Sequence, residues 1–150
     1  MITRWLLAAV HLLGLGIGLG AIWVRATALR TSLDSGQIQR VLRADGLWGV
    51  AALIWIGSGI WRLLGGLEKP PEYYFHNVAF QVKMGLLGLV LLLEIQPMLT
   101  FISWRRRLAA GGQPATQSAP RLATVSFVQA GLIVLMVLAA TAMARGLGSR

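Results

Sequence analysis

The fold is decided by residues 79–102, which read AFQVKMGLLGLVLLLEIQPMLTFI. A helix of about 20 mainly apolar residues crosses the hydrocarbon core of a bilayer, and this stretch is long enough to do so. It nevertheless contains Lys83 and Glu94. Ionisable side chains in a membrane helix are costly to insert, so these two residues are the first candidates for a function.

Three further apolar stretches are long enough to cross a membrane, namely residues 5–24, 46–64 and 123–143. Hydrophobic residues make up 56% of the 150 and charged residues 13%, so the chain is more apolar than a soluble domain. Backbone groups inside a bilayer have to be hydrogen-bonded within their own segment, so each stretch is predicted to be a helix. The expected fold is all-α, a four-helix transmembrane bundle with short loops that forms a single integral membrane domain over residues 1–150, with helices at about 5–27, 44–65, 78–103 and 122–145.

Arginines are distributed unevenly among the connections between these stretches. They concentrate in the first and third connections, as Arg25, Arg30, Arg40, Arg43, Arg105, Arg106, Arg107 and Arg121. Basic loops stay in the cytoplasm, so both termini are predicted to face outward from the bacterial inner (plasma) membrane. The net charge of +9 then indicates topology and attraction to anionic lipid headgroups of the bilayer. Nucleic acid is not an expected partner, because the charge is split among loops.

Several classes of chemistry are excluded by composition and spacing. The chain has no cysteine, which excludes disulfides, thiol catalysis and thiolate ligation of haem. It has no nucleophile and base pair, phosphate-binding loop or metal-ligand cluster at a usable spacing. Soluble enzyme classes are therefore excluded, whereas a membrane enzyme stays open.

The first stretch combines a histidine with closely spaced glycines. Gly14 and Gly18 are four residues apart, which lets the backbone of another helix approach closely. They also leave volume below His11, where a flat macrocycle could lie. His11 itself is either a neutral histidine hydrogen-bonded to another helix or an axial ligand of haem iron through a ring nitrogen. A bare metal ion is not expected, since no second ligand lies at a suitable spacing on this helix.

Polar residues of the third stretch share one helical face. Residues seven and eleven apart return to nearly the same side, which aligns His76, Lys83 and Glu94, with Asn77 at the start of the stretch. Lys83 either snorkels outward or lines an internal site, where it is the candidate catalytic residue. Glu94 lies about 16 Å from Lys83 along the helix axis, so its partner has to come from another helix.

The charged residues of the first connection offer partners for this glutamate. Arg25 or Arg43 is the natural choice for Glu94. Asp45 either interacts with the dipole at the start of the second helix or forms an ion pair with one of these two arginines.

Arg62, at the far end of the second stretch, is a candidate for ligand binding. It either snorkels beside the aromatic belt residue Trp61 or reaches the level of His11 and Lys83. A guanidinium at that level could hold a carboxylate such as a porphyrin propionate.

Several spaced residues together resemble a bacterial family of predicted membrane proteins catalogued as a domain of unknown function. The resemblance runs from the first helix to Arg105, and the residues that carry it are Asp45-x-x-x-Gly49, Gly59-x-x-Arg62, Tyr73-Tyr74-x-x-Asn77-x-x-Phe80-x-x-Lys83-Met84, Pro97 and Trp104-Arg105. More distantly, His11 and Lys83 are similar in position to residues of the four-helix bacterial protoporphyrinogen oxidases. That resemblance implies a b-type haem at His11 and a role in activity for Lys83.

Three functional hypotheses are compatible with these patterns. The first is a redox protein that binds b-type haem or a porphyrin through His11, Arg62, Lys83 and the surface of Gly14 and Gly18. The second is a small transporter or membrane-stress component in which Lys83 and Glu94 mark a polar path. The third is a structural subunit without catalytic activity, whose glycine stripe binds a partner membrane helix or a second copy of the chain.

Overall fold

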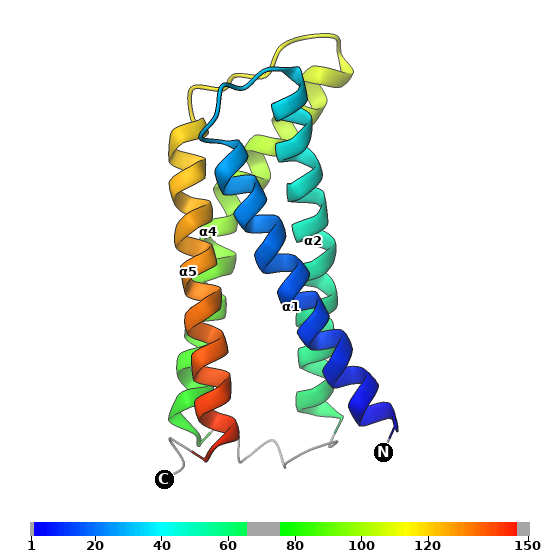
Figure 1. The fold of residues 1–150 in the computed structure, drawn as a ribbon, viewed down its shortest axis with the longest axis vertical. Coiled ribbons are helices and arrows are strands. Elements are labelled where there is room, and N and C mark those ends of the chain that lie inside the picture. Colours follow the sequence, from blue (N-terminus) through cyan, green and yellow to red (C-terminus); the bar gives the residue numbers. More distant parts are fainter. Residues whose placement is uncertain (1, 66–75, 147–150) are drawn as a thin grey trace.

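The computed structural model describes residues 2–65 and 76–146, and these form four long helices. They are α1 (Ile2–Ala28), α2 (Ser35–Leu64), α4 (Val78–Ala109) and α5 (Ala119–Ala144). All four are long and apolar enough to cross a membrane, which confirms the predicted all-α membrane bundle. The helices alternate in direction, so α1 begins and α5 ends at the same end of the bundle (Figure 1). The side of the membrane on which that end lies stays a prediction.

The two ends of the bundle differ in how closely the helices approach one another. We call the end with connections 29–34 and 110–118 the Arg25 end, and the opposite end the His11 end. Figure 1 shows the helices converging at the Arg25 end and separating into an α1/α2 pair and an α4/α5 pair toward the His11 end. Helix α1 also contacts α5, whereas α2 and α4 have few close approaches.

Helix α2 begins at Ser35, about nine residues before the predicted boundary near 44. The Asp34 side chain caps it by accepting a hydrogen bond of 2.8 Å from the backbone N–H of Gln37. The added turns are amphipathic and bury Ile38 and Val41. Hydropathy did not predict these turns as part of the helix, because they also carry two arginines. Asp45 is therefore well inside the helix, and the predicted interaction with its N-terminal dipole is wrong.

The other helices also extend beyond their predicted limits. Helix α4 runs on past residue 103 to Ala109 and continues through the buried Pro97. Helix α5 begins at Ala119, with Pro120 in its first turn. Proline suits this place because the N–H groups of the first turn have no acceptor within the helix, so its missing N–H costs nothing. The connection between them is attached to the bundle by the Trp104 indole N–H, which donates to the carbonyl of Ala115 at 3.0 Å.

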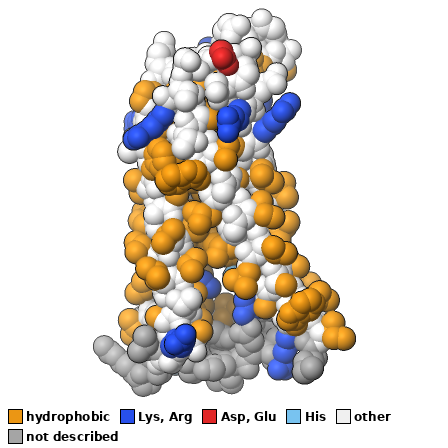
Figure 2. Space-filling model, viewed as in Figure 1, with side chains coloured by type: hydrophobic (Ala, Val, Ile, Leu, Met, Phe, Trp, Pro, Cys, Tyr) orange, Lys and Arg blue, Asp and Glu red, His pale blue; other side chains and the backbone are white. Residues whose placement is uncertain are grey.

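The surface between the two ends is apolar, as a membrane span requires. Figure 2 shows a wide hydrophobic band, with basic side chains above it near the Arg25 end and others at the base. Large exposed side chains of this band come from all four helices and include Leu12, Leu53, Leu92 and Leu138. The charges thus lie near the two levels where headgroups meet hydrocarbon.

Gly14 and Gly18 are packed against α2. A Cβ atom added at Gly14 would lie 3.3 Å from the backbone nitrogen of Trp55, and one at Gly18 would lie 3.0 Å from the Trp48 ring. This is the close helix approach predicted from their spacing. The prediction that the same surface is open to a flat macrocycle is wrong, because α2 covers it.

We expect Gly14→Leu to destabilise the protein by about 2 kcal/mol, because the Trp55 backbone cannot move aside for the larger residue. Gly16→Leu is the matched control, since a Cβ at Gly16 meets nothing within 4 Å. Unfolding of the detergent-solubilised variants, followed by circular dichroism, measures both changes. Equal losses in the two variants would contradict the assigned α1/α2 interface.

Candidate functional site

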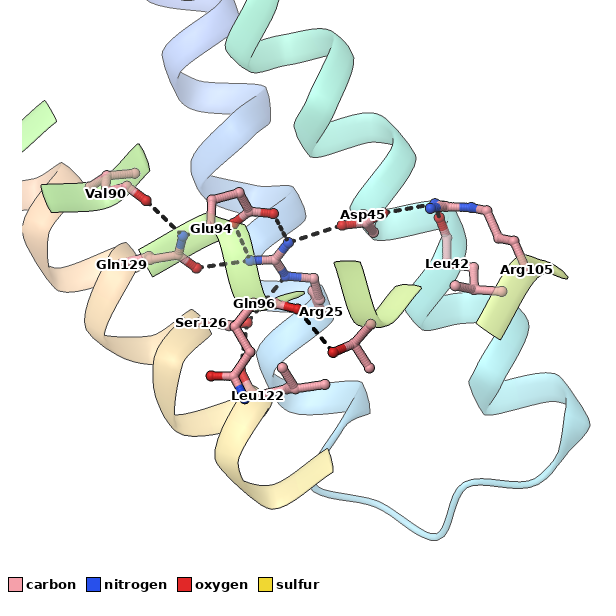
Figure 3. A network of polar contacts seen from close by, with 11 residues as sticks. Arg25, Leu42, Asp45, Val90, Glu94, Gln96, Arg105, Leu122, Ser126 and Gln129 are labelled. Atoms are coloured by element: carbon pink, nitrogen blue, oxygen red, sulfur yellow. Dashed lines mark hydrogen bonds and ion pairs between the residues drawn. The ribbon is translucent and has the colours of Figure 1, made fainter. Parts of the chain in front are cut away.

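A completely buried arginine lies at the centre of the Arg25 end. The Arg25 guanidinium is 0% exposed and forms ion pairs with Asp45 of α2 at 3.1 Å and Glu94 of α4 at 2.7 Å (Figure 3). The prediction that Glu94 and Asp45 pair with an arginine is confirmed for Arg25, whereas Arg43 lies elsewhere in the structure. Three helices thereby meet at one side chain.

Helix α5 completes the coordination of this guanidinium through two polar residues. The Nε–H of Arg25 donates to the Ser126 hydroxyl at 3.1 Å, and one Nη2–H of Arg25 donates to the Gln129 side-chain oxygen at 2.8 Å. The other Nη2–H and the two on Nη1 reach Glu94 and Asp45. All five N–H groups of the guanidinium therefore have an acceptor, which is the condition for burying it without a large penalty.

The acceptors around Arg25 are themselves held in place. The Gln129 amide nitrogen donates to Glu94 at 2.7 Å and to the carbonyl of Val90 at 3.2 Å. Arg105 donates to the second oxygen of Asp45 at 2.8 Å. We call these six residues the Arg25 cluster: Arg25, Asp45, Glu94, Arg105, Ser126 and Gln129. Its two cations and two carboxylates balance, and every N–H of its central guanidinium has an acceptor within the protein.

At the His11 end, a cavity of about 580 Å³ is lined by residues of all four helices. Its polar residues include His11 of α1, Arg62 of α2 and Lys83 of α4, which the sequence predicted to lie at one level. Its apolar walls include Leu15, Trp55, Phe80, Met136 and Met143. Figure 2 shows a hollow with basic side chains in the lower part of the molecule. The cavity therefore combines an apolar interior with two cationic groups.

Hydrogen bonds to α2 hold the imidazole of His11 through Nδ1. Its Nδ1 lies 2.9 Å from the carbonyl oxygen of Trp55 and 3.0 Å from the Ser58 hydroxyl oxygen. The carbonyl can only accept, and the Ser58 hydroxyl already donates to that same carbonyl at 3.0 Å. Nδ1 therefore carries a proton and donates it to this carbonyl.

Gly59 makes room for the imidazole. A Cβ atom at this position would lie 3.1 Å from Cε1 of His11, so a larger residue would push the ring away from α2. The sequence placed Gly59 only within a spaced motif with Arg62. Its contact with His11 could not be predicted, because it depends on how α1 and α2 are rotated against each other.

Two predicted polar residues lie outside both sites. Asn77 is the N-cap of α4 and accepts hydrogen bonds from the backbone N–H groups of Ala79 and Phe80 at 2.9 and 3.2 Å. His76 precedes the helix and is exposed. The predicted alignment of His76 with Lys83 and Glu94 is wrong, because the extended backbone at Asn77 ends the helical periodicity. The predicted motif residues Tyr73 and Tyr74 lie outside the described residues.

The predicted polar path from Lys83 to Glu94 stays a prediction, and the structure places the two residues in different surroundings. Val90, on the same helix between them, is completely buried. The Glu94 carboxylate accepts hydrogen bonds from Arg25 and Gln129 on both of its oxygens. Glu94 belongs to the Arg25 cluster, whereas Lys83 belongs to the cavity.

Replacing Arg25 or Glu94 alone with Met is expected to destabilise the protein by about 3 kcal/mol, because each change leaves the other charge buried without its closest partner. The double variant should lose clearly less than the sum, since Asp45 and Arg105 still balance each other. A double-mutant cycle on detergent-solubilised protein measures this coupling. Additive losses would show that Arg25 and Glu94 do not stabilise each other.

Comparison with known proteins assigns the chain to a family. No curated protein and no solved structure matches it. The likeness of His11 and Lys83 to positions in protoporphyrinogen oxidases therefore stays a prediction. The family described as "Predicted membrane protein (DUF2214)" matches residues 3–148, further along the chain than the motifs that end at Arg105. The chain belongs to this family of predicted membrane proteins, whose function is unknown.

Proposed function

We propose that the protein binds an apolar molecule with anionic groups in the cavity at the His11 end, and that this molecule is b-type haem or a related porphyrin. The contact between Nδ1 of His11 and the carbonyl oxygen of Trp55, at 2.9 Å, carries the proposal. Histidines that ligate a metal through Nε2 donate their other ring N–H to a carbonyl or carboxylate. The hydrogen bond from Nδ1 of His11 to Trp55 is of that kind.

The remaining walls of the cavity suit the other parts of such a ligand. Arg62 and Lys83 provide positive charge for carboxylates, which arginine and lysine bind through charge-assisted hydrogen bonds. Trp55 and Phe80 provide flat apolar surface for a ring system. A volume of about 580 Å³ lies within the usual range of ligand pockets, roughly 300–1,000 Å³.

Each residue of the cavity then has a stated role. His11 would ligate the iron, Ser58 and the Trp55 carbonyl would hold the imidazole, and Arg62 and Lys83 would bind the carboxylates. The apolar residues would exclude water. A bound haem supplies one-electron chemistry, whose direction and rate depend on its axial ligand and surroundings. A porphyrin without iron would use the same cations and walls but not the ligand bond.

We expect protein purified from haem-supplied cells to show a b-type absorption spectrum in the oxidised and dithionite-reduced forms. His11→Ala should lose it, because the proposed iron ligand is removed. His76→Ala is the matched control, since His76 is exposed and does not line the cavity. Absorption spectra of the three purified proteins measure the difference.

Two further outcomes decide between the parts of the proposal. If Arg62→Gln with Lys83→Gln keeps the spectrum but binds haem about tenfold more weakly or worse, the carboxylate contacts are supported. A colourless wild-type protein that also fails to bind added haem or protoporphyrin would contradict the proposal. A spectrum that survives in His11→Ala would contradict the ligand assignment.

A further inference from the structure

A second hollow lies on the outside of the bundle at the Arg25 end, between α1 and α2. It has a volume of about 790 Å³, and we call it the α1/α2 groove. Its apolar wall includes Ile17 and Val24 of α1 and Leu47 of α2. Gly20 leaves the groove open, because this residue has no side chain. A Cβ atom at Gly20 would meet nothing within 4 Å, so the space beside it is empty of other protein atoms.

Two arginines line the groove at the end nearer the start of α2. Arg40 and Arg43 are three residues apart in α2, so they lie on one face of the helix, and both are exposed. Within residues 2–65 and 76–146, no hydrogen bond or ion pair engages either guanidinium. Their charges differ in this respect from that of Arg25, which two carboxylates balance.

The groove thus has positive charge at one end and apolar surface along the rest. A phospholipid has the matching arrangement, with a charged headgroup at one end and hydrocarbon chains along the rest. Ile17 and Leu47 are about half exposed, at 49% and 50%, within the apolar band that lipid chains cover. The basic side chains that Figure 2 shows above this band lie where headgroup phosphates are expected. Arginine forms short, charge-assisted hydrogen bonds with phosphate.

We propose that the α1/α2 groove binds an anionic phospholipid from the leaflet at the Arg25 end. Its phosphate lies between Arg40 and Arg43, and one acyl chain lies along Ile17, Val24 and Leu47. Basic pockets between membrane helices are known to select anionic headgroups on the side where basic loops gather. This site is separate from the cavity at the His11 end, so it does not depend on haem binding.

The test uses the full-length protein in a zwitterionic phosphatidylcholine environment, titrated with phosphatidylglycerol and followed by native mass spectrometry. We expect one tightly retained phosphatidylglycerol. Arg40→Gln with Arg43→Gln should weaken its affinity about 30-fold, the loss expected for two basic side chains near a membrane surface. The matched control is Arg106→Gln with Arg107→Gln, which removes the same charge from exposed positions outside the groove.

Two further arms separate the parts of the site. Gly20→Leu should also lower retention, because it fills the groove without changing the charge, and circular dichroism checks that the variant is folded. Millimolar inorganic phosphate should leave lipid retention unchanged. Equal losses of phosphatidylglycerol affinity in the two arginine double variants would contradict a specific site. They would show that the lipid is held only by general attraction to positive charge. Displacement of phosphatidylglycerol by inorganic phosphate, or its full retention by Gly20→Leu, would contradict binding of the acyl chain in the groove.

Discussion

The burial of one guanidinium constrains the whole bundle. Arg25 is always charged, and a charge placed inside apolar surroundings has to be met by opposite charge and by acceptors for its N–H groups. No single helix of this chain offers all of these. Asp45, Glu94 and the pair Ser126 and Gln129 come from α2, α4 and α5, so all four helices have to converge where α1 ends.

The convergence at the Arg25 end accounts for the opposite character of the His11 end. Packing of α1 against α2 through Gly14 and Gly18 fixes one pair, and packing of α5 against α4 fixes the other. The two pairs separate below the cluster, and the side chains that line the resulting space leave the cavity open. The cluster balances two cations with two carboxylates, whereas Arg62, Lys83 and apolar side chains line the cavity. The ligand proposed for this cavity is anionic.

Much of this arrangement could be predicted from the sequence, because it depends on one helix at a time. The lengths of the apolar stretches predict the four helices. The positions of His11, Arg62 and Lys83 along their stretches predict that they lie at one level. The need of Glu94 for a cation identified Arg25 as a candidate. The rotation of each helix against its neighbours could not be predicted, since periodicity defines a face but not what it meets. For that reason Ser126 and Gln129 can be predicted to hydrogen-bond to another helix but not to Arg25 in particular, and the spacing of Gly14 and Gly18 leaves two uses open.

The most direct test measures whether the Arg25 cluster determines the shape of the His11 end. The chain has no cysteine, so single cysteines at the exposed Leu64 of α2 and Val82 of α4 can carry spin labels without background. The separation of the labels is measured by pulsed electron spin resonance in lipid nanodiscs. We predict a narrow distribution in the otherwise unchanged protein and a clearly shifted or broadened one in Arg25→Met. An identical distribution in both would show that the cavity does not depend on the cluster.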